Sequence, residues 1–248
     1  MPSKAIHLET DGMAPEIELP LRAVATELGS RGIEVIVDGG FSRPDESVVI
    51  CSEGNATSFP QAWRVSTEIA RGLVHLTRGE KTIEIRWTAP RSALRRLPPT
   101  ILARGSGDSR QERMMARTAE ELVRRRAGCR FALWGSLSDE ACERAFDEVH
   151  TDPSASDLQR LLCSSSAVFD PAVALGDATP LPWMAEAVGV PVVVSAEHPF
   201  SAGIRVSEWS PESFADALES ALALEASEGT RRVEESARQL LEALGIDA

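Results

Sequence analysis

Short apolar segments rich in β-branched residues alternate with amphipathic segments along almost the whole chain. This alternation constrains the fold more than any other feature. Residues 33–37 (IEVIV), 47–51 (SVVIC) and 190–195 (VPVVVS) have the composition of buried strands, whereas residues 21–28 repeat their apolar side chains at helical spacing. Continuous apolar strands that alternate with helices are typical of a mainly parallel sheet covered on both faces. The sequence therefore predicts an α/β fold.

A proline-rich stretch at residues 90–99 interrupts the alternation. Each side of it holds its own set of strand-like and helix-like segments, and a chain of 248 residues is long enough for two small domains. We therefore predict an abbreviated α/β domain over residues 1–98 and a second α/β domain over residues 99–248.

Three helices are expected at specific places. One helix is expected over residues 61–71, and another is expected from Ser138, which would cap it, to about residue 149. A further helix is expected over residues 110–126, where Ser109 and Glu112 have the spacing of a capping box.

Charge and hydropathy exclude several classes of protein. The formal net charge is −12, with −1 in residues 1–98 and −11 in residues 99–248. An acidic chain is a poor electrostatic match for bulk nucleic acid or an anionic membrane. No apolar run approaches the ~20 residues of a membrane span, and the first residues lack the apolar stretch of a signal peptide. These features predict a cytoplasmic protein with no membrane span.

The four cysteines show no metal-binding or disulfide pattern, because none forms a CxxC pair. Small buried side chains in a reducing compartment are the expectation, with no metal site. All but two of the basic residues are arginine. A bound anion is therefore expected to meet guanidinium groups.

The first candidate site is the segment at residues 101–113 (ILARGSGDSRQER). It reads as a strand, a loop with Gly105 and Gly107, and a helix start. Glycines let a phosphate approach the backbone, and a helix N-terminus carries free N–H groups and a partial positive charge. Arg104 and Arg110 flank the loop and could clamp a diphosphate. The alternative is an ordinary βα turn with solvated arginines.

The second candidate site is the segment at residues 168–195. A buried strand ends at Asp170, and the following loop holds Gly176, Asp177 and Thr179. Ligands of open α/β sheets bind at the carboxyl ends of strands, where this loop would lie. The alternative is a purely structural loop.

Taken in order, these segments resemble the nucleotide-sugar-binding domain of GT-B glycosyltransferases, especially the retaining family 4 type. Arg104 matches the arginine that follows the family's strand, and Arg110 matches the basic residue about six positions later. Gly189–Val193 (GVPVV) matches the family's Gly-x-Pro-Val-Val. Gly176 fits the loop glycine, and Glu186 fits the glutamate of the family's Glu-Ala pair. The resemblance covers roughly residues 99–225.

The resemblance implies two Rossmann-like parallel-sheet domains that face a cleft. It also implies a retaining, metal-independent transfer of sugar from a nucleotide-diphosphate sugar, such as a UDP-sugar, with no cofactor besides this donor. Arg104 and Arg110 would stabilise the leaving diphosphate, and Asp11, after the first strand, would act as base or contact the acceptor. The donor-binding residues would be Gly105, Gly107, His150, Gly176, Asp177, Thr179 and Glu186.

Two departures from the family keep other functions open. The residue eight positions before Glu186, where the family has its other glutamate, is Ala178. The first domain is also short, which leaves an open cleft and favours a large acceptor such as a saccharide or a modified nucleic acid. The alternatives are a degenerate GT-B-like binding or scaffold protein without transfer activity, and a sugar-nucleotide epimerase.

Overall fold

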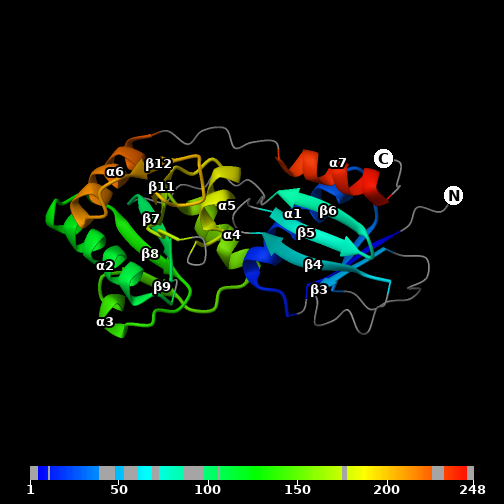
Figure 1. Ribbon diagram of the computed structural model, residues 1–248, viewed down its shortest axis with the longest axis horizontal. Helices are drawn as coiled ribbons and strands as arrows, with labels where there is room; N and C mark the ends of the chain where they lie inside the picture. The colour runs from blue at the N-terminus through cyan, green and yellow to red at the C-terminus, as the bar shows by residue number, and fades with distance from the viewer. Residues whose placement is uncertain are drawn as a thin grey trace. The chain divides into compact units, whose positions relative to one another are not determined.

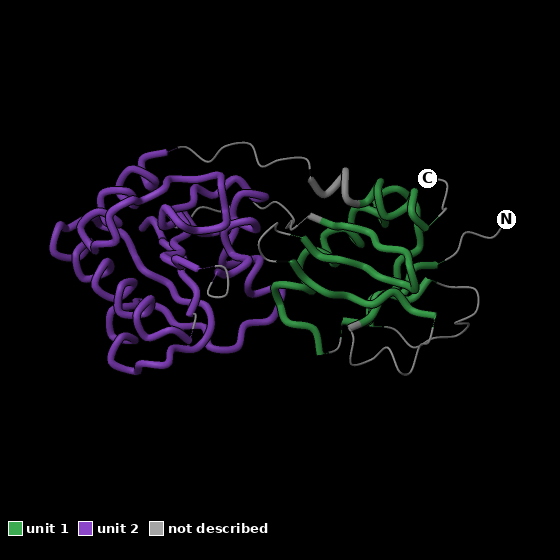
Figure 2. The backbone as a smooth tube through the Cα atoms, in the orientation of Figure 1, with its two compact units in different colours: residues 1–68, 72–90, 231–248 green, residues 69–71, 91–230 purple. Residues whose placement is uncertain are grey.

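The computed structural model describes residues 5–10, 12–38, 48–52, 61–68, 73–86, 98–105, 107–174, 178–224 and 232–244. The chain forms two compact units (Figure 2). The first contains residues 1–68, 72–90 and 231–248, and the second contains residues 69–71 and 91–230. Each unit is built on a six-stranded sheet.

The sheet of the first unit has the strand order β2-β1-β3-β4-β5-β6. Its pairs are parallel as far as β4, and β5 and β6 extend it in the antiparallel direction. The elements of this unit are β1 (Ile6–Glu9), α1 (Pro15–Ser30), β2 (Val35–Val37), β3 (Val48–Ser52), β4 (Trp63–Glu68), β5 (Leu73–Arg78), β6 (Lys81–Arg86) and α7 (Arg232–Leu244).

The C-terminal helix belongs to the first unit. In Figure 1, α7 lies beside α1 and β6, and it packs against both. Packing thus groups the residues differently from the predicted division into 1–98 and 99–248, because the chain returns to the first unit after residue 230.

The helix predicted over residues 61–71 is wrong, because residues 63–68 form strand β4. Trp63 and Val65 are buried whereas Arg64 and Ser66 are exposed, which is the two-residue period of a strand. This strand pairs with β3 on one side and β5 on the other. Pairing with distant segments therefore decided its conformation.

The sheet of the second unit has the strand order β12-β11-β10-β7-β8-β9, and all its pairs are parallel. The elements of this unit are β7 (Thr100–Arg104), α2 (Ser109–Arg124), β8 (Arg130–Trp134), α3 (Glu140–Glu143), β9 (Glu148–His150), α4 (Ala155–Ser164), β10 (Ala167–Asp170), α5 (Leu181–Ala187), β11 (Val192–Ser195), β12 (Ile204–Val206) and α6 (Pro211–Ala223).

The second sheet is covered by helices on both faces. In Figure 1, α2 and α6 lie on one side of it and α4 and α5 on the other. Alternate strand residues such as Ile101, Phe131 and Phe169 pack with α2 and α6 in one buried cluster that includes Phe214. The residues between them, such as Leu102, point to the face that α4 and α5 cover.

Two predicted helix limits differ from the structure. The N-cap of α2 is Asp108, whose carboxylate accepts the Arg110 N–H at 2.9 Å, so the capping box expected from Ser109 is wrong. The helix predicted over residues 138–149 is also wrong, because α3 has only four residues and β9 follows it. The Asp147 carboxylate accepts the Phe131 N–H of β8 at 2.8 Å. This bond holds the chain beside β8 at the residue before β9 begins.

Candidate functional site

The carboxyl ends of β7 and β10 lie side by side where the strand order of the second sheet reverses. From β7 the order continues through β8 and β9, and from β10 it continues the other way through β11 and β12. In open α/β sheets, ligands bind in the crevice that such a reversal opens at the carboxyl edge. Arg104 ends β7 and Asp170 ends β10. This edge is therefore the candidate site.

Two predicted site residues and a tryptophan form one row across this edge. Arg104 pairs in register with Trp134, which pairs in register with His150. The Arg104 guanidinium carbon lies 4.6 Å from the centre of the buried Trp134 ring. His150 is half-buried, and its Nε2 atom lies 3.4 Å from a Glu148 carboxylate oxygen. The structure thus brings Arg104 and His150 to the same edge, with an indole between them.

The loop after β7 is packed tightly against the loop after β8. A Cβ atom on Gly105 would lie 2.2 Å from the carbonyl oxygen of Ser136, so only glycine fits there. The Gly105 N–H donates to the Trp134 carbonyl at 2.8 Å. Gly107 has a φ of +74°, in the left-handed region that favours glycine. Both predicted glycines are therefore required by the loop's own conformation.

The buried carboxylate of Glu112 joins these two loops. It accepts the N–H of Gly107 at 3.2 Å, the N–H of Ser138 at 2.9 Å, the hydroxyl of Ser138 at 2.6 Å and the N–H of Asp139 at 3.2 Å. Glu112 is fully buried in the first turns of α2. It therefore fixes the candidate phosphate-binding loop to its neighbour.

Arg110 approaches the edge from the other side of the sheet. It lies in the first turn of α2, and its guanidinium carbon is 4.3 Å from the centre of the Trp209 ring. Arg104 is two residues after Leu102 in the same strand, so both side chains face the side of the sheet that α4 and α5 cover. Helix α2 covers the opposite face. The two predicted arginines therefore do not form one cluster, and each is stacked on its own indole.

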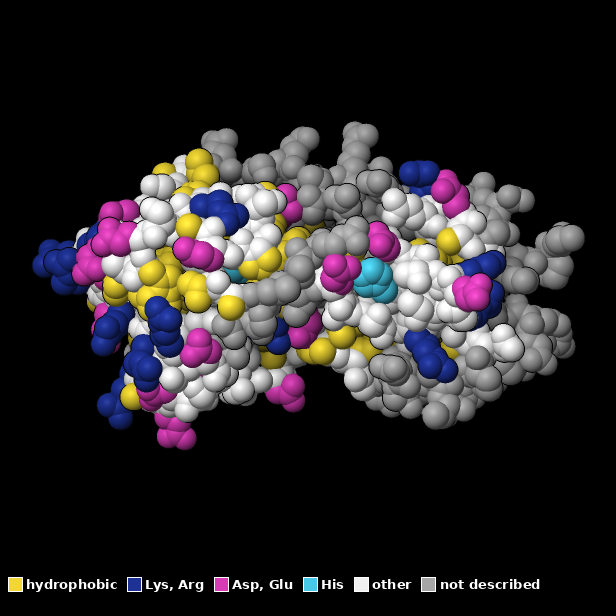
Figure 3. Space-filling model, in the orientation of Figure 1, with side chains coloured by type: hydrophobic (Ala, Val, Ile, Leu, Met, Phe, Trp, Pro, Cys, Tyr) yellow, Lys and Arg dark blue, Asp and Glu magenta, His cyan; other side chains and the backbone are white. Residues whose placement is uncertain are grey.

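The N-terminus of α2 is less electropositive than the sequence predicts. The Asp108 cap places a carboxylate at the helix end and uses the Arg110 N–H. A carboxylate there opposes binding of a second anion. Positive charge comes instead from exposed arginines along the helix, and Figure 3 shows basic side chains gathered over α2 with acidic ones between them.

Asp170 connects the loops that follow β10 and β11. Its carboxylate accepts the Thr179 hydroxyl at 2.8 Å, the Thr179 N–H at 3.2 Å and the Ala172 N–H at 3.1 Å. His198 Nε2 lies 3.4 Å from the same carboxylate, and its Nδ1 accepts the Phe200 N–H at 3.0 Å. Nδ1 therefore carries no hydrogen, and Nε2 lies beside Asp170 without a hydrogen bond to it. Thr179 thus lies at the predicted edge, but its hydroxyl proton is used by Asp170.

Glu186 lies at the opposite edge of the sheet from Arg104. Helix α5 begins next to the carboxyl end of β10 and runs back, so its penultimate residue reaches the amino end of β11. There Glu186 lines a largely apolar groove of about 330 Å³ with Gly189–Val192, Phe200, Ala202, Gly203 and Leu224. Three other predicted residues, Asp11, Gly176 and Asp177, lie outside the described residues.

A charged network lies around Thr10, at the carboxyl edge of the first sheet. The Asp38 carboxylate accepts the Thr10 N–H at 2.7 Å and hydroxyl at 2.8 Å, and Arg22 donates to it at 2.7 Å. Burial acts to raise the pKa of Asp38, but the hydrogen bonds from Thr10 and the charge of Arg22 outweigh it. The pKa of Asp38 is therefore held below its usual value.

Sequence reasoning missed three residues of the second site: Glu112 as a link between loops, Trp134 as a platform and Trp209 as a partner of Arg110. The sequence did mark Glu112 as an acidic residue in the first turn of a helix. Its role follows from its burial, because a buried carboxylate needs several hydrogen-bond donors. Trp209 carried none, because it is far from Arg110 in the sequence.

Among the described residues, no group of three or more histidine, cysteine, aspartate or glutamate side chains is arranged to hold a metal ion. No helix in the described parts of the chain is both long and apolar enough to cross a membrane.

No protein-family model matches the chain, and no curated protein sequence matches it. Solved structures do match. A protein assigned as a UDP-N-acetylglucosamine 2-epimerase from Listeria monocytogenes aligns with a TM-score of 0.52 and 11% identity, over 98% of this chain and 96% of that one. This likeness bears out the predicted fold class, two Rossmann-like α/β units of the GT-B type.

Two other solved structures align less well. A UDP-forming α,α-trehalose-phosphate synthase from Burkholderia xenovorans gives a TM-score of 0.41 and 13% identity, over 78% of this chain and 57% of that one. An Escherichia coli trehalose-6-phosphate protein bound with UDP-2-fluoro glucose gives a TM-score of 0.40 and 13% identity, over 98% and 71%. The chain spans little more than half of the Burkholderia protein.

Proposed function

We propose that this protein binds a nucleotide-diphosphate sugar at the carboxyl edge of its second sheet and transfers the sugar to an acceptor. One observation carries the proposal. Arg104 ends β7 beside the Gly105–Gly107 loop, at the strand-order reversal of a GT-B-type fold. In α/β sheets this is the place where nucleotides bind. The donor class comes from the sequence resemblance and fits a site with arginines on two sides.

The chemistry of the proposed reaction requires stabilisation of a leaving diphosphate. Negative charge grows on the diphosphate as the glycosidic bond breaks. Arg104, supported by Trp134, would meet that charge from the face that α4 and α5 cover, and Arg110 from the face that α2 covers. A preorganised donor of this kind contributes roughly 3–4 kcal/mol to transition-state stabilisation. Two guanidinium groups could therefore supply the electrostatic part of a metal-independent reaction.

His150 would lie near the nucleobase, because it ends β9, the edge strand of the second sheet, in register with Trp134 and Arg104. The location of Glu186 at the amino edge argues against a ribose contact from that side chain. The acceptor would meet the carboxyl edge of the first unit, where Asp11 follows β1. We propose retention at the anomeric carbon and a large acceptor on the sequence resemblance alone.

Calorimetry with UDP-, GDP- and dTDP-sugars tests donor binding. We expect one of them to bind with a dissociation constant in the micromolar range, and the Arg104→Ala, Arg110→Ala double variant to lose that binding. Arg117→Ala is the matched control, because Arg117 is exposed farther along α2. If none of the three nucleotide sugars binds, the proposed function is wrong.

A sugar-nucleotide epimerase is the second candidate, favoured because the Listeria protein matches both units over nearly the whole of both chains. Incubation with a bound donor separates the candidates. A glycosylated acceptor supports transfer, whereas an altered donor sugar without an acceptor product supports epimerisation. Binding without turnover would instead support the binding or scaffold function.

A further inference from the structure

Arg110 is an exposed side chain in the first turn of α2, yet it has a defined partner. A free arginine on a helix surface samples many rotamers, so ligand binding loses the conformational entropy of that side chain. Here the guanidinium carbon lies 4.3 Å from the centre of the Trp209 ring, well within the range of a cation–π contact. The indole therefore restricts Arg110 before any ligand arrives.

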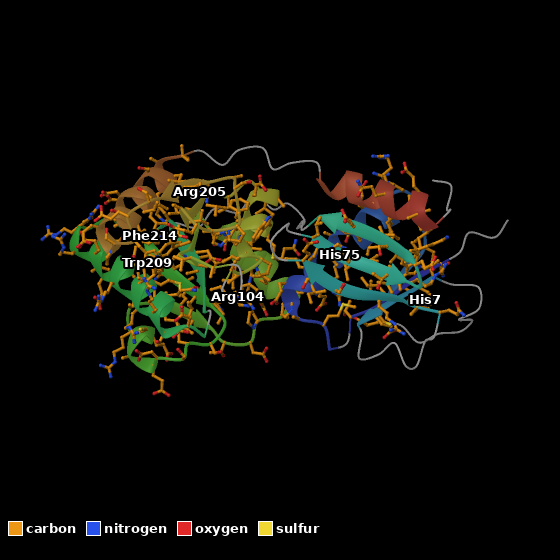
Figure 4. The ribbon with its side chains drawn as sticks, viewed as in Figure 1. His7, His75, Arg104, Arg205, Trp209 and Phe214 are labelled. Carbon is orange, nitrogen blue, oxygen red and sulfur yellow. The ribbon has the colours of Figure 1, made fainter. Side chains whose placement is uncertain are left out.

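Trp209 is itself fixed by two further contacts. Its ring packs, half-buried, against the cluster that contains Phe214, and Figure 4 shows the two residues side by side. Its indole N–H donates to the carbonyl of Pro171 at 3.2 Å. The ring is therefore anchored by packing on one side and by a directional hydrogen bond at its polar end.

Pro171 gives the position of this anchor in the fold. It directly follows Asp170, the last residue of β10, and β10 is the neighbour of β7 across the strand-order reversal. Trp209 therefore ties the first turn of α2 to the end of β10. Arg104 stands at the end of β7, so the two arginines are held at the ends of adjacent strands.

We propose that Trp209 is a positioning residue that holds Arg110 at the strand-order reversal, ready to meet the diphosphate of a nucleotide donor. The proposal rests on the proposed function for its ligand class. Both parts of the indole contribute: the ring face orders the guanidinium, and the N–H fixes the ring to Pro171. Arg104 on Trp134 repeats the same device on the other face of the sheet.

The test compares three variants of the full chain. Trp209→Leu removes the ring face and the N–H, and Trp209→Phe keeps an aromatic face but loses the N–H. Trp183→Phe is the matched control, since Trp183 is a buried indole of the same unit that packs on Phe200 and His198. Unfolding midpoints of all three identify any variant that fails to fold.

The first readout is the relaxation of the Arg110 Nε–Hε group by nuclear magnetic resonance, which needs no ligand. We expect a rigid group in the wild type and in Trp183→Phe, an intermediate one in Trp209→Phe, and a mobile one in Trp209→Leu. Equal mobility of Arg110 in the wild type and Trp209→Leu would overturn the proposal.

The second readout is the affinity for UDP, GDP and dTDP. We expect the nucleotide that the wild type binds to bind about tenfold more weakly to Trp209→Leu, equivalent to about 1.4 kcal/mol, and about threefold more weakly to Trp209→Phe. Unchanged affinity in Trp209→Leu overturns the role in donor binding. If the wild type binds no nucleotide, the proposed function fails while the relaxation data still decide whether Trp209 holds Arg110.

Discussion

Replacing Glu112 should lower the free energy of unfolding and loosen the loops of the candidate site, because this helical residue binds donors from both loops. The Glu112→Gln variant keeps the side chain's shape but turns one acceptor oxygen into an NH₂ group. In the wild type both carboxylate oxygens face donors from Gly107, Ser138 and Asp139. An amide placed there must point its own N–H groups at some of these donors.

The magnitude follows from the number of donors. A hydrogen bond to a charged group contributes about 1.5–3 kcal/mol, and an orphaned buried donor costs about 1–3 kcal/mol. Because Gln keeps part of the set, we expect Glu112→Gln to lower the free energy of unfolding by about 2 kcal/mol. Glu112→Ala leaves every donor without this partner, and water can replace only some of the bonds, so we expect about 4 kcal/mol.

Urea unfolding followed by circular dichroism measures the change in free energy, and amide hydrogen exchange at Gly107 and Ser138 shows whether the loops open. Glu120→Gln, on the exposed face of the same helix, is the control and should stay within about 0.5 kcal/mol of the wild type. If Glu112→Gln is as stable as this control and exchange is unchanged, the carboxylate does not hold the loops together and the reasoning is refuted.

Three other changes have defined outcomes. Asp108→Asn keeps an N-cap but removes a charge, so calorimetry should show nucleotide affinity rising about two- to fivefold; lower affinity would contradict the electrostatic argument. Asp170→Ala leaves the Thr179 donors unpaired and should cost about 3 kcal/mol in urea unfolding, and a loss below about 1 kcal/mol would contradict the network. Hydrogen bonds from Arg124 and Arg125 lower the pKa of Glu121 to about 2 from 4.5, so this carboxylate stabilises the fold fully above pH 4.5 and loses the effect as the pH falls towards 2. Thermal melts should therefore show the gap between wild type and Glu121→Gln closing over that range, and a constant gap would exclude this cause.

The fold class could be predicted because continuous apolar strands and helical stripes alternate along the chain. The errors arose where local spacing fits two conformations. Residues 63–68 carry side chains that suit a helix or a strand, and pairing with β3 and β5 decides between them. Residues 148–150 join the sheet because β8 offers an open edge. No local pattern contains these long-range pairs.

The candidate site was predictable where it depends on strand ends. Arg104 was placed at this edge because it ends a strand that the sequence predicts. His150 was named from the family resemblance alone, and the strand that it ends was predicted as part of a helix. The partner of Arg110 was not found, because Trp209 reaches it only through folding. Glu186 was placed at the site by its position next to a family-like motif. The length of α5 carries it to the other edge of the sheet instead.

The central claim is that a nucleotide diphosphate binds at the carboxyl edge of the second sheet. An amide chemical-shift map of the full chain titrated with UDP, and then with GDP and dTDP, tests it most directly. We predict that the largest shifts fall on residues 104–110, 134–138 and 170–174. Shifts confined to the groove around Glu186, or no shifts with any of the three nucleotides, would contradict the account.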